Sequence, residues 1–313
     1  MTNNHNVIFL FSGQGSQYPN MLLEQCQDHP DIQASLQSCM DHFTLLGCPL
    51  SAIWSTDAIH ETRYTQPALF CVEYALGQYW LNQGLSPDLM IGHSIGELVA
   101  ATLSGVMPLE TACRLVYHRA LNMHQVDVDG GMLAVLAPME EWQDMMPETL
   151  DIAAYNAPNQ TVLSGDRGEI LSLQQTLKDK KIRAIPLTVS HPFHSRLMTS
   201  ALSGFAASIE SFQFAKPTHT IIGNVTHEPI KEYDVQYWCD HIVKPVYFVQ
   251  SIEKALAQCS QPIFIEMGPQ PVLINLIKRY VPEATFLPTL EKKGDLSTQI
   301  DLIQKALGES HER

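Results

Sequence analysis

The sequence lacks an apolar segment long enough to cross a membrane, and it is poor in basic residues. No uninterrupted apolar run approaches the roughly 20 residues that a membrane-spanning helix needs. Lys and Arg number 19 against 33 Asp and Glu, and the net charge of −14 disfavours binding to the phosphates of nucleic acids. The first residues, MTNNHNVIFLF, carry no basic n-region, so we expect no signal peptide. We therefore expect a cytoplasmic protein that binds neither membranes nor nucleic acid.

Sequence patterns typical of metal sites and redox motifs are also missing. The seven cysteines include no CxxC pair, and the 13 histidines include no HExxH or comparable spacing. An odd number of cysteines without such a pattern fits a reducing compartment, in which thiols serve as small apolar side chains. We expect no metal site.

What the chain does contain is an alternation of strand-like and helix-like patterns. With 313 residues, 45% of them hydrophobic and 17% charged, it can form a substantial core and two domains or subdomains. NVIFLFSG (6–13) and DLMIG (88–92) have the pattern of buried strands, and TQPALFCVEYALGQYWLNQG (65–84) that of a helix. This alternation predicts an α/β fold with a parallel sheet covered by helices.

The order of predicted elements changes between residues 127 and 197. A strand, a helix over MEEWQDMM (139–146), two strands, a further helix and a last strand follow one another. The succession β-α-β-β-α-β is that of a ferredoxin-like unit. We therefore predict a smaller subdomain at 127–197, inserted into a larger, discontinuous subdomain formed by 1–126 and 198–313.

The pentapeptide GHSIG (92–96) places Ser94 between two glycines, after a predicted strand and before a predicted helix. This strand–turn–helix context is the one that a nucleophile elbow requires. A helix N-terminus at Ser94 would also favour developing negative charge. The alternative is a serine that only caps a helix in a glycine-rich turn. The context favours acyl transfer of some kind.

A nucleophilic serine needs a base, and VSHPFHS (189–195) offers His191 and His194 well downstream. A histidine in a proline turn is more often structural. Two histidines at a predicted subdomain junction make a catalytic role more plausible than one alone.

Several segments together carry a family resemblance, and they occur in the family's order. They are FSGQGSQYPNM (11–21), YTQPALF (64–70), GHSIGELVAA (92–101), YHRALNM (117–123), NAPNQTVLSG (156–165), SHPFHS (190–195), IIGNVT (221–226), YWCDHIVKPVYF (237–248) and FIEMGPQPVL (264–273). From Val7 to Leu290 the chain resembles the malonyl-CoA:acyl-carrier-protein acyltransferases of fatty-acid and polyketide synthesis. The resemblance implies an α/β-hydrolase-like larger subdomain with a ferredoxin-like insertion, an acyltransferase activity and no bound cofactor.

The resemblance also implies catalytic roles for matching residues. Ser94 would accept the acyl group, and His194 would be its general base and later its general acid. The backbone carbonyl of His241, where relatives usually carry Asn or Gln, would orient His194 in place of a carboxylate. The backbone amides of Gln14 and Ile95 would form an oxyanion hole.

Three further residues would select the substrate. Arg119 would bind the free carboxylate of malonyl, and Gln66 would line the same pocket. Phe193, one residue before His194, is expected to limit the size of the acyl group. Without the resemblance, Arg119 would be interpreted as a residue of a surface ion pair and Gln66 as a polar helix terminus.

The expected partners are malonyl-CoA and the phosphopantetheine thiol of an acyl carrier protein or polyketide synthase carrier domain. A chain of this length carries no ketosynthase or carrier domain, so we expect it to act in trans, and SHPFHS favours the polyketide type. We also expect a monomer. A housekeeping fatty-acid enzyme, a hydrolase of the same fold that clears carrier proteins, and a non-catalytic scaffold are the alternatives. Because carrier proteins are usually acidic, the basic segment LKDKKIR (177–183), expected near the cleft between the subdomains, is a candidate docking surface.

Overall fold

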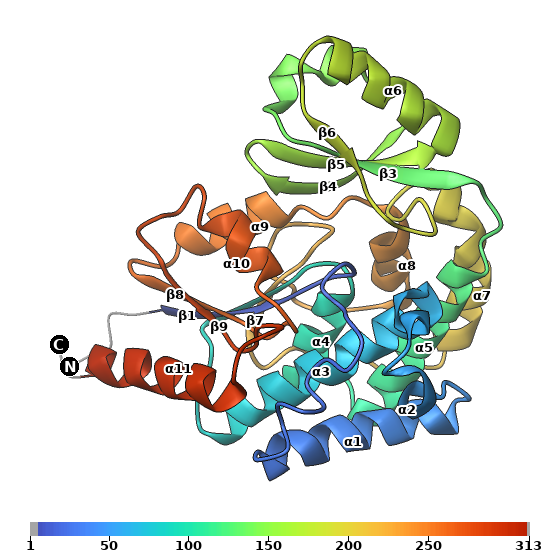
Figure 1. Cartoon of the computed structure of the whole chain (residues 1–313). Helices are drawn as coiled ribbons and strands as arrows, with labels where there is room; N and C mark the ends of the chain where they lie inside the picture. The colour runs from blue at the N-terminus through green and yellow to red at the C-terminus, as the bar shows by residue number, and fades with distance from the viewer. Residues whose placement is uncertain (1–5, 312–313) are drawn as a thin grey trace.

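The chain folds around two sheets, one in each half of Figure 1. The computed structural model describes residues 6–311, with side chains as far as residue 308. Residues 1–5, to which the signal-peptide expectation applies, and residues 312–313 at the end of the larger subdomain lie outside the described residues. Among the described residues, none of the helices combines the length and apolar character that crossing a membrane would require. The seven cysteines are free thiols, and all except Cys259 are buried.

The first sheet consists of five strands in the order β7-β2-β1-β8-β9, and all neighbouring pairs are parallel. The strands are β1 (Asn6–Phe11), β2 (Leu89–Gly92), β7 (Thr220–Ile222), β8 (Pro262–Glu266) and β9 (Thr285–Pro288). The chain first adds strands on one side of β1 and then on the other. In open parallel sheets, ligands bind beyond the carboxyl ends of the strands near such a reversal. The crevice beyond the carboxyl ends of β1 and β8, where the strand order reverses, is therefore where this fold favours a site.

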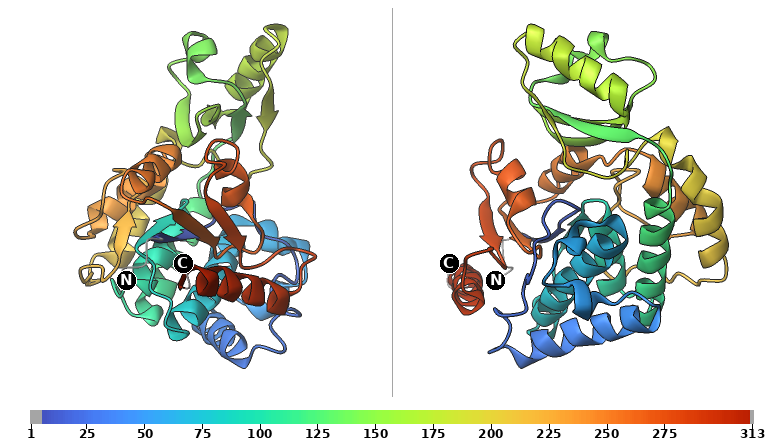
Figure 2. Two further views of the ribbon diagram at one scale, coloured as in Figure 1. Left: turned by 90° about the vertical axis from the view of Figure 1, so that its left-hand side faces the viewer. Right: turned by 45° about the vertical axis from the view of Figure 1, so that its right-hand side comes forward.

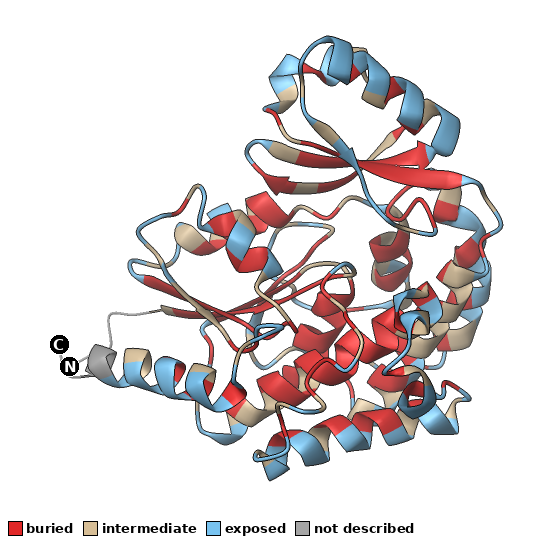
Figure 3. Cartoon of the chain, in the orientation of Figure 1, coloured by how far each residue is buried: buried red, intermediate tan, exposed pale blue. Residues whose placement is uncertain are grey.

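Helices cover both faces of this sheet, with α9 and α10 above it and α3, α4 and α11 below it in Figure 1. The elements of this part are α1 (Pro30–Leu45), α2 (Leu50–Ile53), η1 (Asp57–His60), α3 (Thr62–Asn82), α4 (Ile95–Leu103), α5 (Leu109–His124), η4 (Arg196–Ala201), α7 (Leu202–Ile209), α8 (Val235–Val243), α9 (Phe248–Leu256), α10 (Val272–Ile277) and α11 (Leu296–His311). Every residue of α4 is buried (Figure 3), as expected for a helix whose sequence has no polar face. The predicted α/β class is confirmed.

The second sheet is antiparallel, with the order β4-β5-β3-β6. It consists of β3 (Gly130–Val135), β4 (Asp151–Ala157), β5 (Gln160–Asp166) and β6 (Ala184–Pro186), and α6 (Arg167–Asp179) packs on one face. Figure 2 shows from two directions that this part projects from the larger one. The strands have the order of the ferredoxin-like unit that the sequence predicts. They lie within 127–197, and the exact boundaries of that subdomain remain a prediction.

The two faces of β3 belong to two different cores. Leu133 and Val135 pack with α6 in a small separate cluster, whereas Met132 and Ala134 join the core of the larger part. Main-chain bonds add to this junction, because Val246 donates to Ala153 and accepts from Tyr155. The second sheet is thus held against the larger part by its apolar face and by backbone pairing.

The helix predicted at 139–146 is absent, and two short 3₁₀ turns, η2 (Met139–Glu141) and η3 (Gln143–Met145), take its place. Pro138 and Pro147 leave only this short segment between them. Trp142 interrupts the helical backbone with φ −141°, is buried, and donates from Nε1 to the carbonyl of Ala137. Burial of this one large side chain determines the local structure here.

Candidate active site

Ser94 lies at the sharp turn between β2 and α4, as the N-cap residue of that helix. Its φ of 51° is in the left-handed region, which is uncommon for a residue other than glycine. The turn leaves no room for side chains at the flanking glycines. A Cβ on Gly92 would lie 2.1 Å from the amide nitrogen of Glu97, and one on Gly96 would lie 2.2 Å from the carbonyl oxygen of Phe11. The predicted elbow is therefore present, and the glycines are required by backbone contacts.

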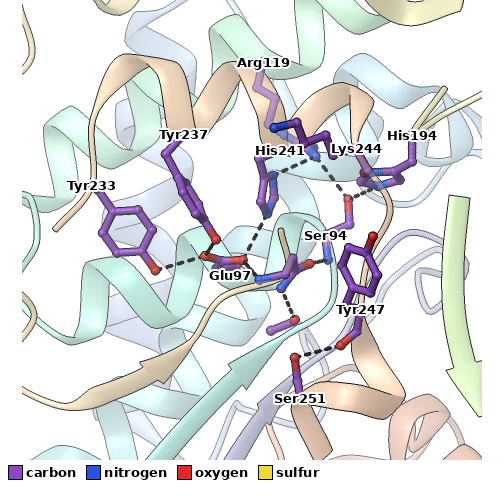
Figure 4. Close-up of polar contacts among 12 residues, drawn as sticks. Ser94, Glu97, Arg119, His194, Tyr233, Tyr237, His241, Lys244, Tyr247 and Ser251 are labelled. Atoms are coloured by element: carbon purple, nitrogen blue, oxygen red, sulfur yellow. Dashed lines mark hydrogen bonds and ion pairs between the residues drawn. The ribbon is translucent and has the colours of Figure 1, made fainter. Parts of the chain in front are cut away.

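His194 contacts the serine directly, with its Nε2 2.9 Å from Ser94 Oγ (Figure 4). It too has a positive φ, 55°. Burial, and secondarily the charge of Arg119, lower the pKa of His194 well below its ordinary value, which keeps the ring neutral and able to accept a proton. The structure thus brings together the two residues that the sequence predicts as nucleophile and base.

The carbonyl that holds His194 differs from the one expected. His194 Nδ1 lies 3.0 Å from the carbonyl oxygen of Lys244, so the expectation for the His241 carbonyl was wrong. Lys244 precedes Pro245 and follows the end of α8 with φ −84° and ψ 157°. A residue before proline disfavours the helical conformation. The chain therefore leaves the helix at Lys244, and this turns its carbonyl toward His194.

Arg119 reaches the same serine from α5 although it is only 1% exposed. Its Nη2 donates to Ser94 Oγ over 3.1 Å, and its Nη1 donates to Gln66 Oε1 over 2.6 Å. Burial lowers the pKa of Arg119 to about 9, so the guanidinium remains charged at neutral pH. A buried cation that is held by neutral partners and faces a nucleophile can bind an anionic group of a substrate.

Gln66 links this arginine to the loop after β1. Its Nε2 donates to Gln14 Oε1 over 3.1 Å. Ile95 is the first residue of α4, where a backbone amide has no acceptor within the helix. The loop that carries Gln14 also passes close to the turn before α4, since a Cβ on Gly13 would lie 3.0 Å from the carbonyl oxygen of His93. An oxyanion hole formed by two amides needs such proximity.

Two polar residues below Ser94 were not assigned a role from the sequence. Asn224 accepts from the backbone amide of Ser94 over 2.6 Å and donates to the carbonyl of Gly92 over 2.6 Å. Glu97 is fully buried and accepts a hydrogen bond from the backbone amide of Asn224 over 2.7 Å. Both residues lie within segments that carry the family resemblance, GHSIGELVAA and IIGNVT, and that was the available signal.

The remaining candidates lie beside the site or away from it. His191 Nδ1 is 2.8 Å from Ser190 Oγ, and no hydrogen bond joins the described ring to Ser94. Phe193 is buried, and its ring packs against that of His191 at 5.8 Å between centroids.

The basic segment 177–183 does not lie in the cleft between the subdomains, so that expectation was wrong. It forms the end of α6 and the loop to β6, at the top of Figure 1, because α6 packs on the face of the second sheet turned away from the larger part.

Comparisons with known proteins show to which family the chain belongs. The family model for the acyl transferase domain matches residues 8–312. The PKS-NRPS hybrid synthetase acdB of Aspergillus candidus is 33% identical over 328 residues, which cover 97% of this chain and 13% of that synthetase. This chain therefore spans a small part of the length of that relative.

Solved structures match over most of the chain. The acyltransferase domain from the second module of the salinomycin polyketide synthase is 32% identical with a TM-score of 0.88, covering 95% of this chain and 72% of that one. The malonyl CoA-acyl carrier protein transacylase from Clostridium perfringens is 26% identical with a TM-score of 0.87, covering 98% of this chain and 99% of that one. The resemblance inferred from the sequence is confirmed, and the chain belongs to the acyl transferase domain family.

Proposed function

We propose that this chain transfers a malonyl group from malonyl-CoA to the phosphopantetheine thiol of an acyl carrier protein through an ester on Ser94. The observation that carries the proposal is the position of Ser94 Oγ, 2.9 Å from His194 Nε2 and 3.1 Å from Arg119 Nη2. One atom is thus next to a neutral base and next to a buried cation. The first contact supports nucleophilic attack, and the second supports a substrate with a carboxylate.

In the first half-reaction, His194 Nε2 takes the hydroxyl proton as Ser94 Oγ attacks the thioester carbonyl. The amides of Gln14 and Ile95 would stabilise the tetrahedral oxyanion, and the carbonyl of Lys244 would keep the imidazole oriented. The C–S bond then breaks, and the proton on His194 goes to the departing sulfur of coenzyme A. In the second half-reaction the carrier thiol gives its proton to His194, attacks the ester, and Ser94 recovers its proton. This is a ping-pong sequence with one site for two acyl acceptors.

Arg119 would hold the free carboxylate of malonyl. Its Nη2 is already turned to the reacting oxygen, and its Nε has no hydrogen-bond partner among the described residues. A guanidinium offers paired donors that match the two oxygens of a carboxylate. The Clostridium perfringens relative is a malonyl CoA-acyl carrier protein transacylase, which supports the same substrate for this chain.

For the pathway we propose a trans-acting role in polyketide synthesis, with housekeeping fatty-acid synthesis as the alternative. The SHPFHS segment and the similarity to a polyketide synthase acyltransferase domain support the first. The free thiols support a reducing, cytoplasmic setting. The expected monomeric state remains a prediction.

The test is intact-protein mass spectrometry after incubation with malonyl-CoA, followed by addition of carrier protein. We expect one added malonyl group on the protein, its loss when carrier protein is added, and its appearance on the carrier. Ser94→Ala should accumulate no adduct, whereas the control Ser172→Ala on α6 should behave as the unchanged protein. Loss of the adduct to water at the same rate without carrier would instead identify a hydrolase, and an adduct on Ser94→Ala would overturn the assignment.

A further inference from the structure

His241 on α8 lies between two buried charged side chains, Arg119 and Glu97. Its Nδ1 is 3.5 Å from Arg119 Nη2, and its Nε2 is 3.3 Å from Glu97 Oε2 (Figure 4). The side chains of His241 and Glu97 are both 0% exposed. The ring therefore connects the cation at Ser94 with a carboxylate below it.

Glu97 is well supplied with neutral donors. Its Oε1 accepts hydrogen bonds from the hydroxyls of Tyr233 and Tyr237, and its Oε2 accepts one from the backbone amide of Asn224. None of these donors carries a charge. A carboxylate and a guanidinium that are both removed from water are each costly unless an opposite charge compensates them. In this structure the compensation between Glu97 and Arg119 passes across the His241 ring.

The contacts of His241 determine where its proton lies. A guanidinium has only donors, so Nδ1 must be the acceptor that faces Arg119. A neutral imidazole then carries its hydrogen on Nε2, which lies 3.3 Å from Glu97 Oε2 without making a hydrogen bond to a described residue, so this contact is electrostatic. Burial lowers the pKa of His241, the nearby Arg119 lowers it further, and Glu97 opposes both effects. The rings of His194, Tyr237 and Trp238 also surround it, and none adds a negative charge.

We propose that His241 is a positioning residue for Arg119, which it holds in the orientation that binds the carboxylate of the acyl donor, with Glu97 fixing the ring from the other side. This inference rests on the proposed function. It gives the side chain of His241 a role, whereas the backbone carbonyl that orients His194 belongs to Lys244. Gln66 holds Arg119 Nη1, and Nη2 contacts both Ser94 Oγ and His241 Nδ1. Because Ser94 Oγ is the reacting atom, His241 is the partner of Nη2 that does not take part in the reaction.

The test compares a carboxylated acyl donor with a neutral one. His241→Leu replaces the ring with an apolar side chain and so removes both polar contacts. His241→Asn places an amide acceptor near the position of Nδ1, facing Arg119. His219→Leu is the matched control, since His219 lies far from the site, next to Ser86 and Thr218. The measurements are kcat/KM for acyl-enzyme formation with malonyl-CoA and with acetyl-CoA, together with thermal unfolding of each variant.

We expect His241→Leu to lose about tenfold to hundredfold in kcat/KM for malonyl-CoA, the range for one hydrogen bond to a charged group, and much less for acetyl-CoA. His241→Asn should restore most of the malonyl preference, and His219→Leu should leave both values unchanged. Equal losses with the two donors, or a His241→Asn variant as unselective as His241→Leu, would overturn the positioning role. If His241→Leu does not fold, His241→Ala is compared with His241→Asn in the same assay.

Failure of the proposed function gives a different result. The unchanged protein would then form no malonyl ester on Ser94, and no comparison of variants would be needed. A malonyl ester on the unchanged protein combined with equal losses in His241→Leu would refute only the inference about His241.

Discussion

At the scale of single residues, Ser94 and His194 share an unusual backbone conformation, with φ of 51° and 55°. Positive φ in residues other than glycine costs on the order of 1–3 kcal/mol and persists only where the surroundings enforce it. Asn224 holds the amide of Ser94, and Lys244 holds the ring of His194. The contact with Asn224 therefore helps to maintain the strained backbone at Ser94, and the contact with Lys244 orients the ring of His194 toward it.

The pH dependence of acylation should reflect the environment of His194. Its neutral form is the base, and burial lowers its pKa well below the ordinary value. As pH falls, the ring therefore stays neutral longer than a free histidine, so the acid limb of kcat/KM should lie below about pH 6.5. Arg119 also lowers this pKa, so with acetyl-CoA the acid limb of Arg119→Ala should move to higher pH. A pH–rate profile of both proteins checks this, and an acid limb above pH 6.5 in the unchanged protein would contradict it.

Arg119→Ala should discriminate between acyl donors. Malonyl brings a carboxylate into a buried pocket. Loss of the guanidinium should therefore lower kcat/KM for malonyl-CoA by an amount that corresponds to about 2–5 kcal/mol of lost transition-state stabilisation. Acetyl-CoA lacks that carboxylate and should lose far less. Hydrolysis of the acyl-enzyme should rise relative to transfer. Arg114→Ala is the control, because Arg114 lies on the same helix but is exposed and stacks on Phe212. Equal losses on both donors would make Arg119 a structural residue.

Phe193→Ser should relax selection against a 2-methyl group. The buried ring lies one residue before His194, and selection by size alone is worth about 1–3 kcal/mol per methyl group. We expect a higher ratio of methylmalonyl-CoA to malonyl-CoA acylation and a lower efficiency with malonyl-CoA. Phe193→Leu, which keeps an apolar side chain of nearly the same size, should shift the ratio less. An unchanged ratio in Phe193→Ser would leave the ring with a packing role alone.

At the scale of elements, the turn between β2 and α4 depends on close backbone contacts. The side chain of Ser94 can reach His194 and Arg119 because α4 begins within three residues of the end of β2 and passes close to the end of β1. The register of β1 with β2 pairs Phe11 with Gly92, so the loops that follow the two strands start at the same level of the sheet. Parallel pairing thus places the segment with Gln14 beside Ser94.

Gly96→Ala should disrupt this turn. The added Cβ would lie 2.2 Å from the carbonyl oxygen of Phe11, a backbone atom that cannot rotate away. Overpacking of this kind typically costs about 1–3 kcal/mol, more than the gain in helix propensity of about 1 kcal/mol from replacing Gly. We expect a lower Tm and slower formation of the acyl ester. In Gly131→Ala on β3 the added Cβ would be no closer than 3.7 Å to its neighbours, so this variant should leave the acylation rate unchanged. Normal acylation by Gly96→Ala would show that the turn can rearrange.

At the scale of the whole molecule, the charge is unevenly distributed. The chain has a net charge of −14, yet the end of α6 and the following loop present a group of exposed basic residues, Lys178, Lys180, Lys181 and Arg183. A strongly negative protein repels an acidic partner at long range, so a local positive surface can favour one orientation of approach.

Docking of the carrier at this surface, although the surface lies away from the cleft between the subdomains, predicts that reversing the charge of these four basic residues raises the KM for an acidic carrier protein several-fold at low ionic strength and leaves the KM for malonyl-CoA unchanged. The effect should fade with added salt, because the screening length is about 10 Å at 0.1 M. Steady-state kinetics at several salt concentrations measure it. A KM for carrier protein that does not respond would exclude this surface from carrier recognition. Reversal of four other exposed basic residues, Lys216, Lys231, Lys278 and Arg279, gives the same change in net charge and is the control.

The sequence by itself determined the elements with strong local patterns and the residues within tight motifs. Continuous apolar runs fixed β1 and β2, and glycines around Ser94 fixed the turn, because these features depend on neighbours only a few residues away. The chain order of nucleophile and base pointed to both His191 and His194, about a hundred residues after Ser94. The family resemblance selected His194, and the structure places its side chain in contact with Ser94.

Only the tertiary structure decided which atoms complete the site. Asn224 contacts Ser94 from 130 residues away, and Lys244 contacts His194 from 50 residues away. The periodicity of the sequence does not show which carbonyl after α8 points toward His194, since that depends on where α8 ends and how it packs. The same holds for the contacts of His241 with Glu97 and Arg119, which form only when α4, α5 and α8 pack together. Local chemistry selects elements and turns, whereas burial of charge and polar pairing between distant segments are properties of the packed chain.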